Sequence, residues 1–160
     1  LSKGRNKRQE IKMDKKTGLM TTSFVVFAVA VPFVMYKLGA PRVSLFMVSL
    51  IMALAFITSY MMIPQLFLND KTIVIKNNFV NIKIPFGDIN TIEENPKIGL
   101  NIRTMGVGGL FGHFGYFNGN DVWYVTNIHN KVKITMKSGK IYMISPENPE
   151  EFIKIVKNFS

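Results

Sequence analysis

Side chains that commonly carry catalysis or bind metals are sparse in this chain of 160 residues. It has no cysteine, which excludes thiolate catalysis and disulfide bonds. His113 and His129 have no acidic neighbour at the spacing that a metal site needs, which favours turn or surface histidines over ligands. Glu93 and Glu94 are adjacent, whereas paired catalytic carboxylates need different environments, so we interpret them as solvated charges. These residue types predict a protein that is not an enzyme and uses no metal or cofactor.

The most distinctive segment is the glycine-rich stretch at residues 103–117, in which five glycines alternate with large apolar side chains. A phosphate-binding loop is one alternative, but no Lys-Ser/Thr pair follows the glycines and no strand–loop–helix pattern surrounds them. We instead predict a long loop that folds onto its own sheet, with buried aromatic rings and glycines at positive φ. The residues of this loop that could contact a partner are Gly106, Gly108, Gly109, Phe111, His113, Phe114, Tyr116 and Phe117.

Two uncharged, apolar runs precede this region, at residues 17–36 and 43–69. The hydrocarbon core of a bilayer requires about 20 such residues in a helix. Buried helices of a soluble protein would show a polar face, and a cleaved signal sequence would have a shorter apolar run. The pattern therefore predicts two transmembrane helices, at about residues 18–37 and 43–65. Neither run contains a charged residue, which favours an anchor over a transport path.

Basic residues dominate the first 16 residues, which we predict to be a cytoplasmic tail because cytoplasmic segments are enriched in Lys and Arg. Two spans then return the chain to the same side, so both termini are predicted to be cytoplasmic. The tail either only sets this topology or also contacts anionic lipid headgroups, at about 1 kcal/mol per residue. The candidate headgroup contacts are Lys3, Arg5, Lys7, Arg8, Lys12, Lys15 and Lys16.

The net charge of +10 is concentrated beside the apolar runs, since the chain from Asp70 onward has 11 basic and 8 acidic residues. This distribution does not favour nucleic acid as a partner. The same part of the chain has short alternating runs typical of strands, at residues 71–76, 79–84, 86–93, 121–126, 131–137 and 140–144. Asn77 and Asn78 predict a two-residue turn that can take positive φ.

The C-terminus is different, because Asn148 followed by proline and two glutamates is typical of a helix start. Phe152, Ile155, Val156 and Phe159 recur at helical spacing, which predicts an amphipathic helix over 149–159. The predicted fold is α+β. A transmembrane helical hairpin precedes an antiparallel β-sandwich or partial barrel, residues 69–160, capped by a C-terminal helix.

Three stretches together resemble the bacterial pleckstrin-homology-like family over about residues 69–160. They are Arg-Thr-x-Gly-x-Gly-Gly-Leu-Phe-Gly-x-Phe-Gly-Tyr-Phe at 103–117, Trp-Tyr-Val-Thr-Asn at 123–127 and Lys-Ile-Tyr-Met-Ile-Ser-Pro-Glu-Asn-Pro-Glu-Glu-Phe at 140–152. The resemblance implies two roughly orthogonal antiparallel sheets capped by a helix, and no catalytic motif. It does not carry over phosphoinositide binding, because the first hairpin has only Lys76 and Lys83.

These observations predict a membrane-anchored binding or scaffolding module at the inner face of a bacterial cytoplasmic membrane. Its expected partners are the lipid bilayer and either another protein or a second copy of itself, with no small-molecule substrate. Two alternatives stay open. The protein could protect its cell against a membrane-active peptide such as a bacteriocin, or its domain could sense anionic lipids.

Overall fold

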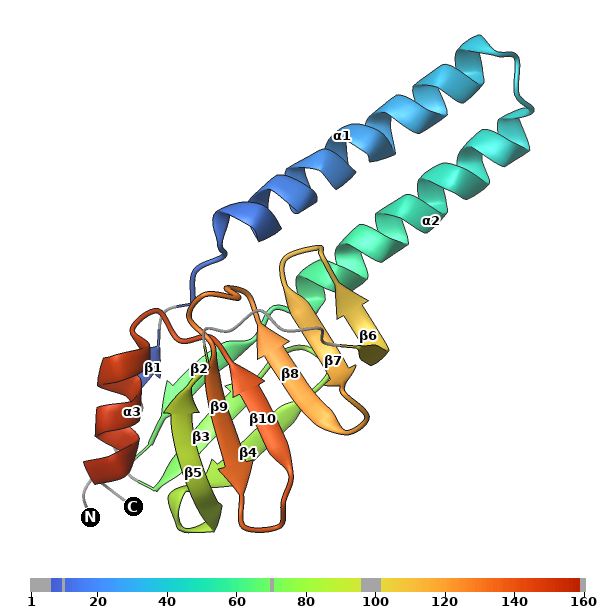
Figure 1. Ribbon diagram of the computed structural model, residues 1–160. Coiled ribbons are helices and arrows are strands. Elements are labelled where there is room, and N and C mark those ends of the chain that lie inside the picture. Colours follow the sequence, from blue (N-terminus) through green and yellow to red (C-terminus); the bar gives the residue numbers. More distant parts are fainter. Residues whose placement is uncertain (1–6, 10, 70, 96–101, 159–160) are drawn as a thin grey trace.

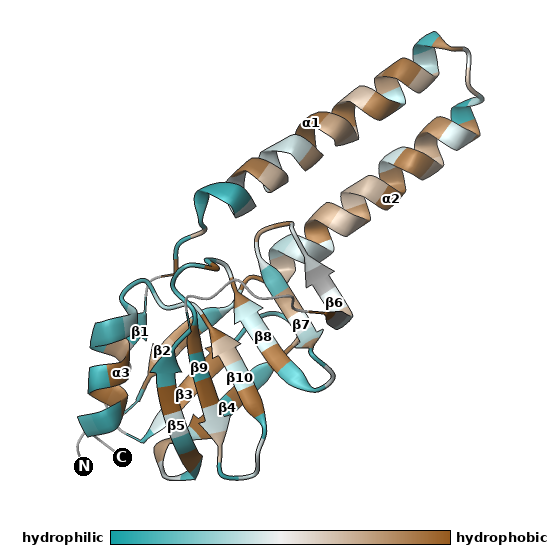
Figure 2. Cartoon of the chain, in the orientation of Figure 1, coloured by the Kyte–Doolittle hydropathy of each residue, from teal (hydrophilic) through white to brown (hydrophobic). Residues whose placement is uncertain are grey.

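Two long helices project side by side from a β domain in the computed structural model, which describes residues 7–9, 11–69, 71–95 and 102–158 (Figure 1). Helix α1 (Lys15–Lys37) and helix α2 (Arg42–Met61) are both long and apolar enough to cross a membrane. Gly39, at φ +76°, lies in the connector between them. Hydrophobic residues follow one another along the middle of both helices (Figure 2). Thr17 and Ser59 are the only buried residues in the two helices, so their apolar side chains are exposed or, like Phe56, only partly buried.

The second helix ends at Met61, although the sequence predicted about residue 65. Pro64 explains the difference, because proline lacks an N–H and disfavours helical geometry in the preceding residue. The chain then enters strand β2 (Gln65–Leu68), where Leu66 and Leu68 are buried in the domain core. The β domain therefore starts within the run that the sequence analysis assigned to the second span.

The first sheet has four antiparallel strands in the order β1–β2–β3–β4. Strand β1 (Lys7–Gln9) belongs to the basic tail, and it pairs with β2 through Arg8 opposite Phe67. Strands β3 (Thr72–Lys76) and β4 (Asn81–Pro85) form the predicted hairpin. Its turn was predicted wrongly, since residues 77–80 connect the strands and neither asparagine has positive φ. The Asn77 carboxamide oxygen instead accepts hydrogen bonds from the Phe79 and Val80 amides, at 2.8 and 2.9 Å.

The second sheet has six strands in the order β5–β9–β10–β8–β7–β6. After a short 3-10 turn, η1 (Phe86–Asp88), its strands follow in the chain as β5 (Ile89–Glu94), β6 (Arg103–Gly108), β7 (His113–Phe117), β8 (Asp121–Val125), β9 (Val132–Met136) and β10 (Ile141–Ile144). Neighbouring strands are antiparallel except β8 and β10, which are parallel. The parallel pair differs from the expected all-antiparallel arrangement. It arises because β9 lies two positions from β8 and β10 returns between them.

Helix α3 (Pro149–Asn158) completes the core. The Glu151 amide donates to the Asn148 side chain at 3.2 Å, which confirms the predicted helix start. Phe152 and Val156 are buried with strand residues of both sheets, including Ile75 and Ile134, whereas Phe159 lies outside the described residues. The described residues thus form an α+β structure with two open sheets and no closed barrel, and the predicted fold class is confirmed.

Candidate functional site at the helix–domain junction

The glycine-rich segment is a β-hairpin, which corrects the prediction of a long loop. Strands β6 and β7 pair antiparallel, with Gly106 opposite Gly115, and residues 109–112 form the tip. A Cβ atom on Gly106 would lie 2.1 Å from the Phe114 carbonyl oxygen, and one on Gly115 would lie 2.3 Å from that of Met105. Both glycines also have positive φ, as predicted. Glycine at this crossing therefore lets the two backbones approach each other closely.

The tip of this hairpin contacts both long helices. The Phe111 amide donates to the Thr21 hydroxyl of α1 at 3.0 Å. The Phe111 ring lies edge-on to Phe56 and Tyr60 of α2, with centroid distances of 5.2 and 5.6 Å. The side chain of Phe111 is only 7% exposed, so the tip is packed and not free to reach a partner.

Asp14 makes a second connection, at the start of α1. One carboxylate oxygen accepts a hydrogen bond from the Thr17 amide at 2.6 Å and thereby caps the helix. The other oxygen accepts from the Ile128 amide at 3.0 Å, in the loop between β8 and β9. The Asp14 amide donates to the Thr126 carbonyl oxygen at 3.2 Å. One side chain thus joins the first helix to the β domain.

The electrostatics of Asp14 favour its charged form. Burial by itself raises the pKa of this carboxyl, but the hydrogen bonds from Thr17 and Ile128 and the proximity of His129 lower it, and the net effect places the pKa below the ordinary value of 3.8. The junction therefore contains a carboxylate that is ionised at neutral pH.

The end of α2 makes the third connection. The Asn77 carboxamide nitrogen donates to the Met62 carbonyl oxygen at 3.0 Å, and the Asn78 amide donates to that of Met61 at 3.4 Å. The last carbonyl groups of a helix have no partners within the helix. The β3–β4 loop therefore caps α2 while holding it against the first sheet.

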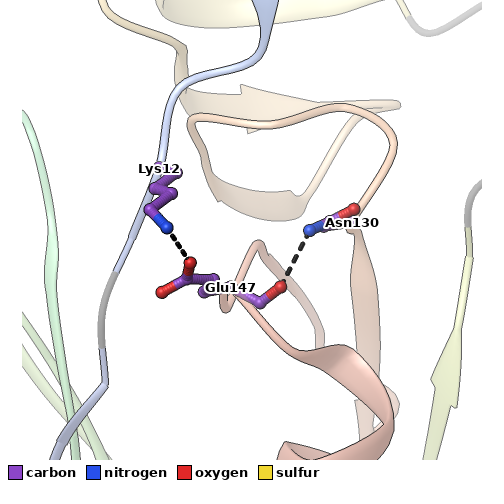
Figure 3. A network of polar contacts seen from close by, with 3 residues as sticks. All are labelled: Lys12, Asn130 and Glu147. Atoms are coloured by element: carbon purple, nitrogen blue, oxygen red, sulfur yellow. Dashed lines mark hydrogen bonds and ion pairs between the residues drawn. The ribbon is translucent and has the colours of Figure 1, made fainter.

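The segment between β1 and α1 is attached to the domain by side chains as well (Figure 3). The Lys12 ammonium pairs with the Glu147 carboxylate, and the Asn130 carboxamide donates to the Glu147 carbonyl oxygen at 3.0 Å. The Thr126 hydroxyl donates to the Lys12 carbonyl oxygen at 3.2 Å. This part of the basic tail is consequently part of the folded unit.

The structure divides the predicted interaction residues of the glycine-rich segment into two groups. Phe111, Phe114 and Phe117 are buried, and the Phe117 ring stacks on Trp123 at a centroid distance of 4.5 Å. His113 is half-buried beside the Phe117 ring, and Gly108 and Gly109 lie at the packed end of the hairpin. Tyr116 is 43% exposed, and it pairs across the strands with Met105, which is 70% exposed. Sequence reasoning did not single out Met105.

Four of the predicted headgroup contacts are described with their side chains. Arg8, Lys12, Lys15 and Lys16 are exposed, at or before the domain end of α1. Lys3 and Arg5 lie outside the described residues, and the Lys7 side chain does too, although its backbone is part of β1. In the described ranges, no group of three or more His, Asp and Glu side chains could hold a metal ion.

Comparison with known protein families places the start of the β domain close to where the structure shows it. The family model described as "Bacterial PH domain" matches residues 64–159. The match begins at Pro64, directly before β2, and contains every later element, so α1, α2 and β1 precede it. No curated protein and no solved structure matches the chain.

Proposed function

The chain belongs to the bacterial PH domain family, and from that membership we propose that it is a non-enzymatic binding module, anchored by its two helices at the inner face of the cytoplasmic membrane. The observation that carries this proposal is the triple attachment of the domain to one end of the helices. The Asp14 cap, the hairpin tip at Phe111 and the Asn77 loop all bind at that end. A domain held in this way has a fixed height and orientation above a membrane surface.

The dimensions and charges of the helices support a membrane location. Helices of 23 and 20 residues are about 35 and 30 Å long, which matches a hydrocarbon core of about 30 Å. Their apolar side chains are exposed, and water would be a poor solvent for them. Lys15 and Lys16 at the domain end favour the cytoplasmic side for that end.

We propose that the partner is a protein or a second copy of the chain and that it binds the outer edge of the β6–β7 hairpin. Strand β6 lies at the end of its sheet, and edge strands present backbone groups that can pair with another strand. Met105 and Tyr116 add an exposed apolar pair on that edge. Of the predicted interaction residues this proposal retains Tyr116, and it adds Met105.

Photo-crosslinking in living cells tests this proposal with the full chain. A photoreactive amino acid at position 105 is expected to give one discrete adduct, either with a specific protein or with a second copy. The control position is Lys83, which is exposed on β4. Equal, diffuse adducts at both positions, or no protein adduct at position 105, would contradict binding at the hairpin edge.

A further inference from the structure

We propose that a cleft between the tail strand β1 and the domain end of α2 binds the phosphate headgroup of an anionic phospholipid of the inner leaflet. The cleft has a volume of about 690 Å³, within the size range of small-ligand sites. Its lining includes Arg8, Gln9, Lys12, Tyr60, Ile63 and Asn78. This inference rests on the proposed membrane anchoring, because anchoring is what brings the cleft to the lipid headgroups.

The position of the cleft along the helices fits a headgroup. Tyr60 and Met61 form the last turn of α2, and both line the cleft. If α2 crosses the hydrocarbon core, this turn lies at the boundary between lipid tails and water, where tyrosine is enriched. The cleft therefore opens at the depth where phosphate groups lie.

The chemistry of the walls fits a phosphate ester attached to an apolar body. Arg8 and Lys12 bring positive charge from the tail, and the Lys12 ammonium also pairs with Glu147. A guanidinium group can donate two parallel hydrogen bonds to a phosphate. Ile11, Tyr60 and Ile63 supply apolar surface in the same cleft, suited to the first carbons of the lipid. Basic pockets at the cytoplasmic end of membrane helices are suited to anionic headgroups in this way.

Gln9 gives an independent indication of a missing acceptor. Its carboxamide nitrogen is one of two side-chain polar atoms that are buried without a hydrogen-bond partner in the described part of the chain. Leaving such a donor unpaired is costly, so buried donors nearly always have an acceptor. Because Gln9 also lines the cleft, a phosphate oxygen bound there would supply the acceptor once the carboxamide turns toward it.

Thermal unfolding of the full chain in an uncharged detergent tests this site. Short-chain phosphatidylglycerol is expected to raise the unfolding temperature in a saturable manner, since a ligand that binds only the folded state stabilises it. Short-chain phosphatidylcholine, which has no net charge, is expected to raise it less, and free glycerol phosphate should have little effect. Equal stabilisation by the two lipids would overturn the proposal. Stabilisation by glycerol phosphate as large as that by phosphatidylglycerol would also overturn it, by indicating a soluble ligand.

Three variants localise the effect. Arg8→Gln is expected to weaken the apparent affinity for phosphatidylglycerol about fivefold or more. Lys83→Gln removes the same charge from an exposed position on β4, outside the lining of the cleft, and it should bind like the parent chain. Equal weakening by both variants would indicate diffuse attraction and overturn a specific site.

Gln9→Met, the third variant, changes no charge and removes the unpaired donor. We expect it to leave the lipid-free unfolding temperature unchanged or higher and to reduce the shift caused by phosphatidylglycerol. A shift as large as that of the parent chain would contradict the role of Gln9. None of these readouts involves a protein partner, so they can fail while crosslinking at position 105 succeeds, and the reverse also holds.

Discussion

Asp14 shows how much of the junction depends on a single residue. Its carboxylate caps α1 through Thr17 and binds the β8–β9 loop through Ile128. These bonds make its folded-state pKa lower than the ordinary 3.8. A depressed carboxyl pKa contributes stability that is fully present above the unfolded-state pKa and is lost as the pH falls through the folded-state value.

Replacing Asp14 therefore has an expected sign at each pH. Asp14→Asn should destabilise the folded chain at pH 7 by about 1–2 kcal/mol, because the amide accepts hydrogen bonds without charge assistance. The difference between variant and parent should shrink as the pH falls below the ordinary carboxyl pKa of 3.8, because the unfolded parent chain then takes up a proton that the folded carboxylate still resists. Unfolding temperatures measured between pH 7 and pH 3 check this. A constant difference across that range would show that the charge of Asp14 is not involved.

The crossing of Gly106 and Gly115 gives a second prediction for single residues. Gly115→Ala places a Cβ 2.3 Å from a backbone oxygen at φ +120°, so the hairpin must shift. We expect a loss of stability of more than about 2 kcal/mol. Gly87→Ala is the matched control, because no atom lies within 4 Å of its Cβ position and its φ is not positive. Similar unfolding temperatures for the two variants would refute the close approach of the strands.

Among the elements, the β6–β7 hairpin connects the sheet to both helices. Phe111→Ala removes the ring that contacts Phe56 and Tyr60, and truncation of a packed phenylalanine costs about 3–5 kcal/mol. Tyr116→Ala, on the exposed part of the same hairpin, should cost less than about 1 kcal/mol.

The distance between spin labels at Ser44, in α2, and Lys83, in β4, reports whether this packing of the hairpin tip fixes the helices relative to the β domain. We expect a narrow distribution in the parent chain and in Tyr116→Ala, and a broad one in Phe111→Ala. A distribution unchanged by Phe111→Ala would mean that the hairpin tip does not hold the helices in place.

The elements also show what the sequence could and could not predict. The two apolar helices were predicted from the length of their uncharged runs. The β3–β4 hairpin, strands β9 and β10 and helix α3 were predicted from clear periodicity or capping residues. Strand β1 has three polar or charged residues and no alternation, so only its pairing with β2 reveals it. The glycines of β6 and β7 conceal the alternation of a strand, because their role is a close approach between backbones that is visible only in space.

The candidate sites were predictable to a smaller extent. Residue types identified the glycine-rich segment and the basic tail as regions of interest. Burial then removed Phe111, Phe114 and Phe117 from the residues available to a partner, and pairing added Met105. The cleft brings Arg8 and Gln9 of the tail next to Tyr60 and Met61 at the end of α2, more than 50 positions later in the chain. Local sequence patterns cannot predict contacts over such a separation.

At the scale of the whole molecule, the helices and the β domain form one unit with three attachments at one end. Because the domain is held at one end of the helices, the side of the membrane on which it lies can be tested. Because the chain has no cysteine, single cysteines can report exposure without background labelling.

Labelling with a membrane-impermeant maleimide in intact cells is the most direct test of the central claim. Ala40→Cys lies in the connector between the helices and Lys83→Cys lies on the β domain. The proposed anchoring predicts that Ala40→Cys is labelled in intact cells and that Lys83→Cys is labelled only after the membrane is permeabilised. Labelling of Lys83→Cys in intact cells, with Ala40→Cys protected, would place the domain outside and contradict the account.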